Sequence, residues 1–382
     1  MQTTPTHSQR IEAIDILRGM TIAGMILVNN PGSNTIFAPL LHAEWMGLTP
    51  TDLVFPFFMF IMGITTYLSL KKYAFEWSVP CVRKIVKRAL LLWFIGLAIE
   101  WLFMFCNGMI SEEGMALPLG SRLWAAINTF GHIRLLGVLP RLGICYGLTA
   151  LIAISMKHKH IPWLVAALFV GYFILLETGN GYAHDETNIL AVADNAVLGS
   201  SHVFRWETPD PEGLLSTLPA LGHVLIGFCV GRGVMDMHRL DNKIERLFLI
   251  GALLTFSGLL LSYACPISKK LWTPTFALTT CGMAATLLAL LTWSIDKHGR
   301  KNTATRFFQV FGVNPLALYV LADVLAIPLV VCPLWQGQTI HSLLMDGFFS
   351  PLLPQKVASL TWSLLYVLLN WAFGYYLFKK KI

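Results

Sequence analysis

Charged residues are scarce in this chain, and their scarcity excludes water as its main solvent. Only 13% of the 382 residues are Asp, Glu, Lys or Arg, whereas 55% are hydrophobic and the mean hydropathy is +0.62. Soluble domains carry about a quarter charged residues. Several stretches contain the roughly 20 apolar residues needed to cross a bilayer. We therefore expect an all-α fold, a polytopic transmembrane helical bundle forming one domain over residues 1–382.

Several sequence motifs are absent, and each absence argues against one class of site or function. The seven cysteines form no CxxC pair and no Cys/His spacing typical of zinc, which predicts packing roles for them and no metal site. No Walker sequence or dinucleotide fingerprint occurs, so ATP-driven chemistry is not expected. The first apolar run lacks a small-residue cleavage site, so no removable signal peptide is expected. The net charge of +7 suits nucleic acid, but the placement of the basic residues argues against such a partner.

Ten hydrophobic segments are candidate spans. The ninth is long and contains Pro315 and Pro328, which predicts a kinked or partly re-entrant segment. Residues 118–134 contain Trp124 and Phe130 and are typical of an amphipathic helix lying along the interface. The ten segments are residues 11–31, 52–70, 86–106, 136–156, 161–177, 214–234, 247–265, 272–294, 307–332 and 357–378, and the outer loops would be about 31–51, 107–135, 178–213 and 333–356.

The distribution of basic residues orients these spans. With a cytoplasmic N-terminus, 21 of the 28 Lys and Arg residues fall on the inner side, from Arg10 to Lys381, and 7 on the outer side. Both termini are then cytoplasmic, and we expect a multi-pass protein of the bacterial inner membrane, embedded in the lipid bilayer. The outer face carries acidic residues, aromatic side chains such as Trp206, and His42. This composition suits a sugar or a cationic acceptor, and a merely solvated loop is the alternative.

His42 is the most informative candidate for chemistry, because it sits in a polar segment between two apolar runs and histidine exchanges protons near neutral pH. Asp52 suits the N-terminus of the second span and is able to hydrogen-bond a histidine. Asn29 precedes the helix-breaking pair Asn30-Pro31, and its amide would orient His42, stabilise an oxyanion or cap the helix. An isolated histidine at an interface is nevertheless more often structural.

A basic inner region is a candidate donor site. Lys72, Lys84 and Arg88 would hold the phosphates of a nucleotide-bearing donor such as a coenzyme A thioester, although positive-inside bias also explains them. Arg18 lies three residues after Asp15 on the first helix, so it would either close an ion pair there or join the donor site.

Polar residues of the outer loops are candidates for binding the acceptor. Asp210 and Glu212 are two residues apart between prolines and, with His202, would bind acceptor hydroxyls or an amine at the entry to the sixth span. The alternative is a purely structural role, since acidic residues are common at helix N-termini. Glu44 and Trp45, next to His42, would complete this substrate-binding set.

Taken together, these segments resemble the heparan-alpha-glucosaminide N-acetyltransferase family of transmembrane acyltransferases. The matches are spread over nearly the whole chain, and residues 45–56 are the most specific. The chain looks like a compact bacterial-type member without the lumenal N-terminal domain of the eukaryotic enzyme. The resemblance rests on DILRG (15–19), MILVN (25–29), HAEWMGL (42–48), DLVFP (52–56), RLG (141–143), DPEG (210–213) and KKLWT (269–273).

The resemblance implies that acetyl-CoA is taken from the cytoplasm and that its acetyl group reaches an amino sugar or oligosaccharide on the other face. His42 matches the family's active-site histidine and Asn29 its partner asparagine. On this hypothesis His42 acts as general base or acetyl carrier, Asn29 donates to the oxyanion, and Asp52 holds the imidazole. No metal is implied, and the family implies a homodimer.

Two alternatives remain open. One is an O-acyltransferase that modifies a surface glycan, since the residue types do not distinguish a hydroxyl from an amine acceptor. The other is a transporter for amino sugars or small solutes, which Glu100 and Asp323 inside predicted spans would suit. The lack of a clear inverted repeat weakens the transporter.

Overall fold

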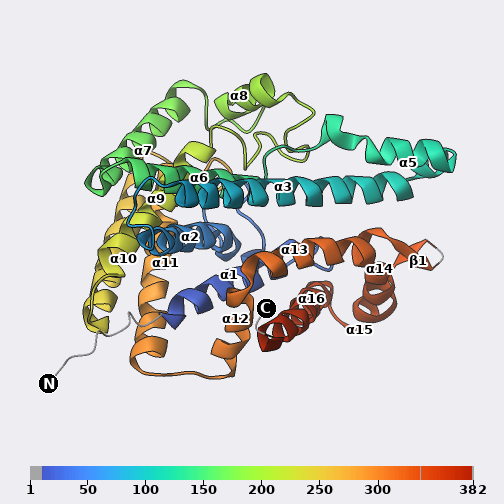
Figure 1. Cartoon of the computed structure of the whole chain (residues 1–382). Coiled ribbons are helices and arrows are strands. Elements are labelled where there is room, and N and C mark those ends of the chain that lie inside the picture. The colour runs from blue at the N-terminus through green and yellow to red at the C-terminus, as the bar shows by residue number, and fades with distance from the viewer. Residues whose placement is uncertain (1–10, 336, 381–382) are drawn as a thin grey trace.

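The computed structural model describes residues 11–335 and 337–380, and most of these residues lie in helices (Figure 1). Within them the strands are β1 (Pro333–Trp335) and β2 (Gln338–Thr339), which pair in antiparallel fashion. The expected all-α bundle is confirmed. Arg10 and Lys381, which belong to the inner set of basic residues, lie outside the described residues.

Eight helices in the described part of the chain are long and apolar enough to span a membrane. A ninth span is formed if α12 (Thr303–Val313) and α13 (Pro315–Ala326), which continues to Val331, count together. The eight are α2 with the turn before it (Pro50–Lys71), α3 (Val79–Ile110), α6 (Val138–Ser155), α7 with the turn before it (His158–Thr178), α9 (Thr217–Val234), α10 (Leu240–Leu261), α11 with the π-turn after it (Pro274–Lys297) and α16 (Gln355–Lys380).

The predicted kink in the ninth span is confirmed. Its two halves are bent by 84°. Asn314 has φ −122° and ψ 56°, outside the helical region, and Pro315 begins the second half. Proline disfavours a helical conformation in the residue before it, and it cannot donate the hydrogen bond that would continue α12.

The first predicted span differs from the others. It is the helix α1 (Glu12–Asn29), but Glu12, Asp15 and Arg18 lie within its 18 residues. By length and composition, eight or nine helices of the described residues qualify as spans, and α1 is not among them because it carries three charges. It packs so tightly that a Cβ on Gly19 would lie 1.8 Å from the carbonyl oxygen of Phe308.

Two hydrophobic cores organise the bundle. The larger is built mainly from α2, α6, α9 and α11, with Phe60 and Phe276 fully buried in it. The smaller joins the C-terminal half of α1 to α12, α13 and α16 around Phe311 and Trp362. Residues of α1 contribute to both cores, so this helix links the two halves of the molecule.

The loops contain short elements. The predicted helix in residues 118–134 is present as α5 (Leu119–Ile127), followed by a 3-10 turn, η3 (Thr129–His132). The predicted loop 178–213 contains a helix that was not expected, α8 (Ile189–Leu198). The remaining short elements are η1 (Ala38–Leu40), η2 (Pro50–Leu53), α4 (Glu112–Met115), η4 (His158–His160), η5 (Thr292–Lys297), η6 (Ile327–Val331), α14 (Ile340–Leu344), η7 (Met345–Phe349) and α15 (Ser350–Leu352).

Candidate active site

The segment that carries His42 folds back on itself before α2. The hydroxyl of Thr49 donates to the carbonyl of Leu41 (2.7 Å), and that of Thr51 donates to the carbonyl of Pro39 (3.1 Å). Gly47 adopts φ +115°, a conformation that favours glycine. A capping box between Thr49 and Asp52 then starts the turn η2. These local bonds bring His42 and Asp52, ten residues apart, into contact.

Asp52 orients the imidazole. Its Oδ2 accepts hydrogen bonds from the backbone N–H of Ala43 (3.1 Å), the backbone N–H of Thr49 (3.1 Å) and the Thr49 hydroxyl (3.0 Å). Its Oδ1 lies 2.6 Å from His42 Nδ1. The Asp52 side chain is 1% exposed and that of His42 is 44% exposed. A carboxylate accepts the Nδ1 proton, so the lone pair of Nε2 is left for a reacting group.

A lysine that the sequence analysis did not select completes this cluster. The Nζ atom of Lys269 lies 3.1 Å from His42 Nδ1, 3.4 Å from Nε2 and 3.7 Å from Asp52 Oδ1. Burial lowers the pKa of Lys269, and the carboxylates of Asp52 and Glu212 oppose that effect. The sequence signal for Lys269 was its place in KKLWT, which was used only for the family resemblance.

Backbone contacts bring the Lys269 turn to His42. The N–H of Gly47 donates to the carbonyl of Ile267 (2.7 Å), and the Ser268 hydroxyl donates to the carbonyl of Trp45 (2.8 Å). The turn closes at Trp272, which is buried and adopts φ +51°. This conformation is strained for a bulky residue and costs about 1–3 kcal/mol, so the packing around it must hold it. Trp272 makes edge-to-face contacts with neighbouring aromatic rings, among them Phe55 and Phe276.

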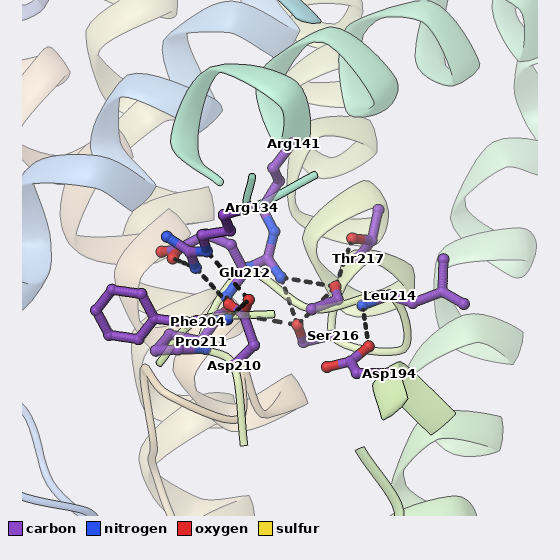
Figure 2. A network of polar contacts seen from close by, with 11 residues as sticks. Arg134, Arg141, Asp194, Phe204, Asp210, Pro211, Glu212, Leu214, Ser216 and Thr217 are labelled. Atoms are coloured by element: carbon purple, nitrogen blue, oxygen red, sulfur yellow. Dashed lines mark hydrogen bonds and ion pairs between the residues drawn. The ribbon is translucent and has the colours of Figure 1, made fainter. Parts of the chain in front are cut away.

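A second polar network lies beside this cluster (Figure 2). Arg134 donates through Nε to Asp210 (3.1 Å) and through Nη2 to both Asp210 and Glu212, the latter at 2.7 Å. Its guanidinium also lies 4.4 Å from the centre of the Phe204 ring. Burial would raise the pKa of Glu212, but Arg134 and Arg141 hold it below its usual value. Asp210 and Glu212 are therefore bound to an internal arginine.

Arg141 extends the network to the start of α9. Its Nη2 donates to the hydroxyl of Ser216 and to the carbonyl of Gly213 (3.1 Å), as Figure 2 shows. The side chain is fully buried, and its Cζ lies 5.4 Å from the centre of the Trp272 ring. Arg141 thus contacts both the 210–216 segment and the turn that carries Lys269.

Asp194 of α8 closes the network from the other side. Its Oδ1 accepts the N–H of Leu214 (2.7 Å). The side chain is buried, and burial raises its pKa to about 6, against the opposing hydrogen bond from Leu214. A Cβ on Gly213 would lie 2.0 Å from Asp194 Oδ2, so any other residue there requires Asp194 to move.

The other predicted acceptor residues are partly engaged. Trp45 donates through Nε1 to the carbonyl of Tyr182 (2.9 Å) and stacks on His184 at 4.2 Å. His202 contacts the carbonyl of Ile133 through Nδ1 (2.7 Å). Glu44 is exposed. Asn29 is exposed too, and no hydrogen bond within the described residues joins it to His42. Its role as the partner of His42 stays a prediction.

Two of the four predicted donor-site residues come together. Arg18 and Arg88 line one cavity of about 370 Å³, although Arg18 also pairs with Asp15 (3.2 Å). Lys84 lies one helical turn before Arg88 on α3 and contacts the Ser69 hydroxyl (3.2 Å). Lys72 is exposed at the end of α2 and does not line this cavity.

Cavities continue from the Arg18–Arg88 cavity toward the Arg134 network. Leu139 and Tyr319 line both this cavity and a second one of about 150 Å³. Glu100 and Arg134 line that second cavity and a third of about 250 Å³. The second also contains Asp323, so both acidic residues predicted inside spans face one space. The three cavities therefore form a series in which neighbours share wall residues. Arg18 lines the first cavity and Trp206 lines the last.

Comparison with known proteins assigns these features to one family. The sequence profile described as heparan-alpha-glucosaminide N-acetyltransferase, catalytic, matches residues 10–266. The mouse heparan-alpha-glucosaminide N-acetyltransferase is 25% identical over 386 residues, covering 85% of this chain and 55% of the mouse protein. The human protein of the same name is 25% identical over 372 residues, covering 81% and 52%. The chain spans about half the length of the curated relatives it matches.

Proposed function

The chain belongs to the heparan-alpha-glucosaminide N-acetyltransferase family, and from this membership we propose that it is a multi-pass membrane acetyltransferase that uses acetyl-CoA and an amino-sugar acceptor. The acetyl group would pass from a cytoplasmic donor to an acceptor on the opposite face. The structural observation that supports this proposal best is the cluster of His42, Asp52 and Lys269. Its geometry supports proton removal next to a fixed positive charge.

In the proposed reaction the amine nitrogen of the acceptor attacks the carbonyl carbon of the thioester. A C–N bond forms, the C–S bond breaks, and the pair of electrons leaves with sulfur. His42 Nε2 takes the proton that the amine loses and returns it to the thiolate, so the products are an N-acetyl sugar and free CoA. Asp52 stabilises the transient imidazolium through Nδ1. The Lys269 ammonium is within reach of the oxyanion.

The cavities support a route for the donor. Guanidinium groups are suited to phosphate, and Arg18 and Arg88 line the first cavity, which is otherwise largely apolar. A slender pantetheine chain requires a passage through the bundle, and cavities that share Leu139 and Tyr319 lead toward Arg134. Arg134 pairs with Glu212, whose charge acts on Lys269 beside His42.

The proposal is tested with the full chain in vesicles. Labelled acetyl-CoA is enclosed on one side, and glucosamine, N-acetylglucosamine and their oligosaccharides are offered on the other. We expect labelled N-acetyl product from the amine-bearing sugars only. His42→Ala should lower the rate at least about 100-fold, the usual contribution of a general base. His238→Ala, at an exposed histidine outside the cluster, is the matched control.

Other outcomes identify the alternatives. Labelled product from N-acetylglucosamine, whose amine is blocked, would indicate a hydroxyl acceptor. Sugar uptake without acetyl transfer, unaffected by His42→Ala, would refute the enzyme and favour a transporter. Direct transfer and an acetyl-His42 intermediate both use the same cluster. Rapid quenching in cold neutral denaturant after incubation with labelled acetyl-CoA alone separates them, because only the second leaves label on the protein.

A further inference from the structure

A further cavity is lined by none of His42, Asp52 and Lys269. It is a groove of about 590 Å³ bordered by α7, α9, α10 and α11, which occupy the same side of the molecule (Figure 1). Its walls are apolar, with Phe169 on α7, Val230 on α9 and Leu254 on α10. These helices are span candidates, and α7 and α10 are largely exposed. The groove therefore opens toward the lipid.

One end of the groove carries a cation. Arg246 is the charged residue of its lining, and its Nε lies 4.0 Å from where a Cβ on Gly233 would be, so the side chain crosses onto α9. Within residues 11–335 and 337–380 no ion pair of Arg246 is formed. Two carboxylates of the same region pair with lysines: Asp236 with Lys71 (2.7 Å) and Asp241 with Lys297 (2.6 Å). The groove therefore combines apolar walls with one cation at its end.

The dimensions of the groove distinguish its occupants. Its lining follows α10 from Arg246 to Leu261, which at 1.5 Å per residue is about 22 Å. This exceeds one leaflet of a bilayer core that is about 30 Å thick. A helix is 10–12 Å across and would need roughly 1,700–2,500 Å³ over that length. An extended hydrocarbon chain needs far less volume than a helix and fits within the groove, and the oligomeric state tests the helix of a second copy.

We propose that this groove binds an anionic phospholipid, with one acyl chain between α7 and α10 and the phosphate on Arg246. The guanidinium fork matches phosphate oxygens, and the apolar walls remove the chain from contact with other lipids. Anionic headgroups are enriched at the membrane surface where basic pockets between spans bind them. The site is independent of the acetyltransferase proposal.

Binding of phosphatidylglycerol to the delipidated full-length protein tests this proposal, with native mass spectrometry and thermal unfolding as readouts. Two variants separate the contacts. Arg246→Gln removes the cation, and Ala166→Phe fills the groove, since Ala166 lines it. Arg239→Gln and Ala167→Phe are matched controls, because both residues are exposed and neither lines the groove. We expect both test variants to weaken binding about tenfold and both controls to leave it unchanged.

Each contrary result overturns the proposal. Equal binding of phosphatidylcholine and phosphatidylglycerol, or full binding by Arg246→Gln, would mean that no anionic headgroup is recognised. Loss in Arg246→Gln with full binding by Ala166→Phe would indicate attraction to the surface without insertion of a chain. A change of oligomeric state in Ala166→Phe, measured by light scattering, would make the groove a contact between copies.

Discussion

At His42, the nearest cation is Lys269, and its Nζ lies within 3.4 Å of both imidazole nitrogens. Any atom that reacts at Nε2 is therefore within reach of this ammonium. The sequence analysis assigned the oxyanion to Asn29, which is exposed and makes no hydrogen bond to His42 in the described part of the chain. Lys269 is a second candidate for the oxyanion donor beside Asn29, and a substitution tests its role.

We predict that Lys269→Met lowers kcat about 100-fold, as loss of an oxyanion donor does in other enzymes. The acceptor KM should change little, because the interaction strengthens only in the transition state. Lys270→Met is the matched control, since Lys270 is the next residue and pairs with Glu207. Steady-state kinetics in vesicles measures both variants. Equal losses in the two variants would contradict a specific role for Lys269.

We predict that the buried carboxyl of Asp194 makes the stability of the protein depend on pH. Its pKa is raised to about 6, so the fold favours the neutral carboxyl. The contribution of Asp194 to the free energy of unfolding is therefore fully present below its ordinary pKa of 3.8. This contribution is lost as the pH rises through about 6. Asp194→Asn should therefore gain roughly 2–3 kcal/mol relative to the parent between pH 4 and pH 8. Unfolding in detergent across this range measures the difference, and parallel curves for the two proteins would refute the prediction.

At the scale of the elements, the conformation of residues 210–217 requires a close approach between Gly213 and the side chain of Asp194. A Cβ on Gly213 would lie 2.0 Å from Asp194 Oδ2 and 2.8 Å from its Cγ. We predict that Gly213→Ala destabilises the protein by about 1–3 kcal/mol, the usual cost of overpacking. Adding Asp194→Ala should recover most of this loss, because the clashing carboxylate is gone. Thermal unfolding of the single and double variants measures the coupling.

Gly171→Ala is the control for this prediction, since nothing lies within 4 Å of a Cβ there. Additive effects of Gly213→Ala and Asp194→Ala would show that the two positions do not clash. The element that supplies Asp194, α8, was not expected from the sequence. Its ten residues are too short to span a membrane, and they became a helix by packing Leu190 against Tyr172 and Leu176.

For the whole molecule, the cavities predict that donor binding and acetyl transfer can be separated. Leu139 is buried and lines both the Arg18–Arg88 cavity and the next one. Leu139→Trp should block the passage and lower transmembrane transfer about 100-fold, as misplacement of a reacting group does. CoA affinity, measured by calorimetry, should fall much less than the transfer rate.

Leu148→Trp is the matched control, because Leu148 lies on the same helix with 41% of its surface exposed. Its transfer rate should equal that of the parent. Full activity of Leu139→Trp would show that the donor takes another route to His42. A parallel loss of CoA affinity would instead mean that the first cavity itself has collapsed.

Local patterns alone determined the class of the fold, most helix positions and the break at Pro315, because hydrophobic length and backbone chemistry act within one segment. They also indicated the pairing of His42 with Asp52, ten residues away, and of Arg18 with Asp15. Lys269 reached His42 only through contacts between residues 45–47 and 267–268, more than two hundred residues apart in the chain. Tertiary packing likewise decided three other features: the ion pairs of Asp210 and Glu212 with Arg134, the burial of the charged helix α1, and the groove at Arg246. The reason is that the free energy of a polar group depends on which distant groups surround it.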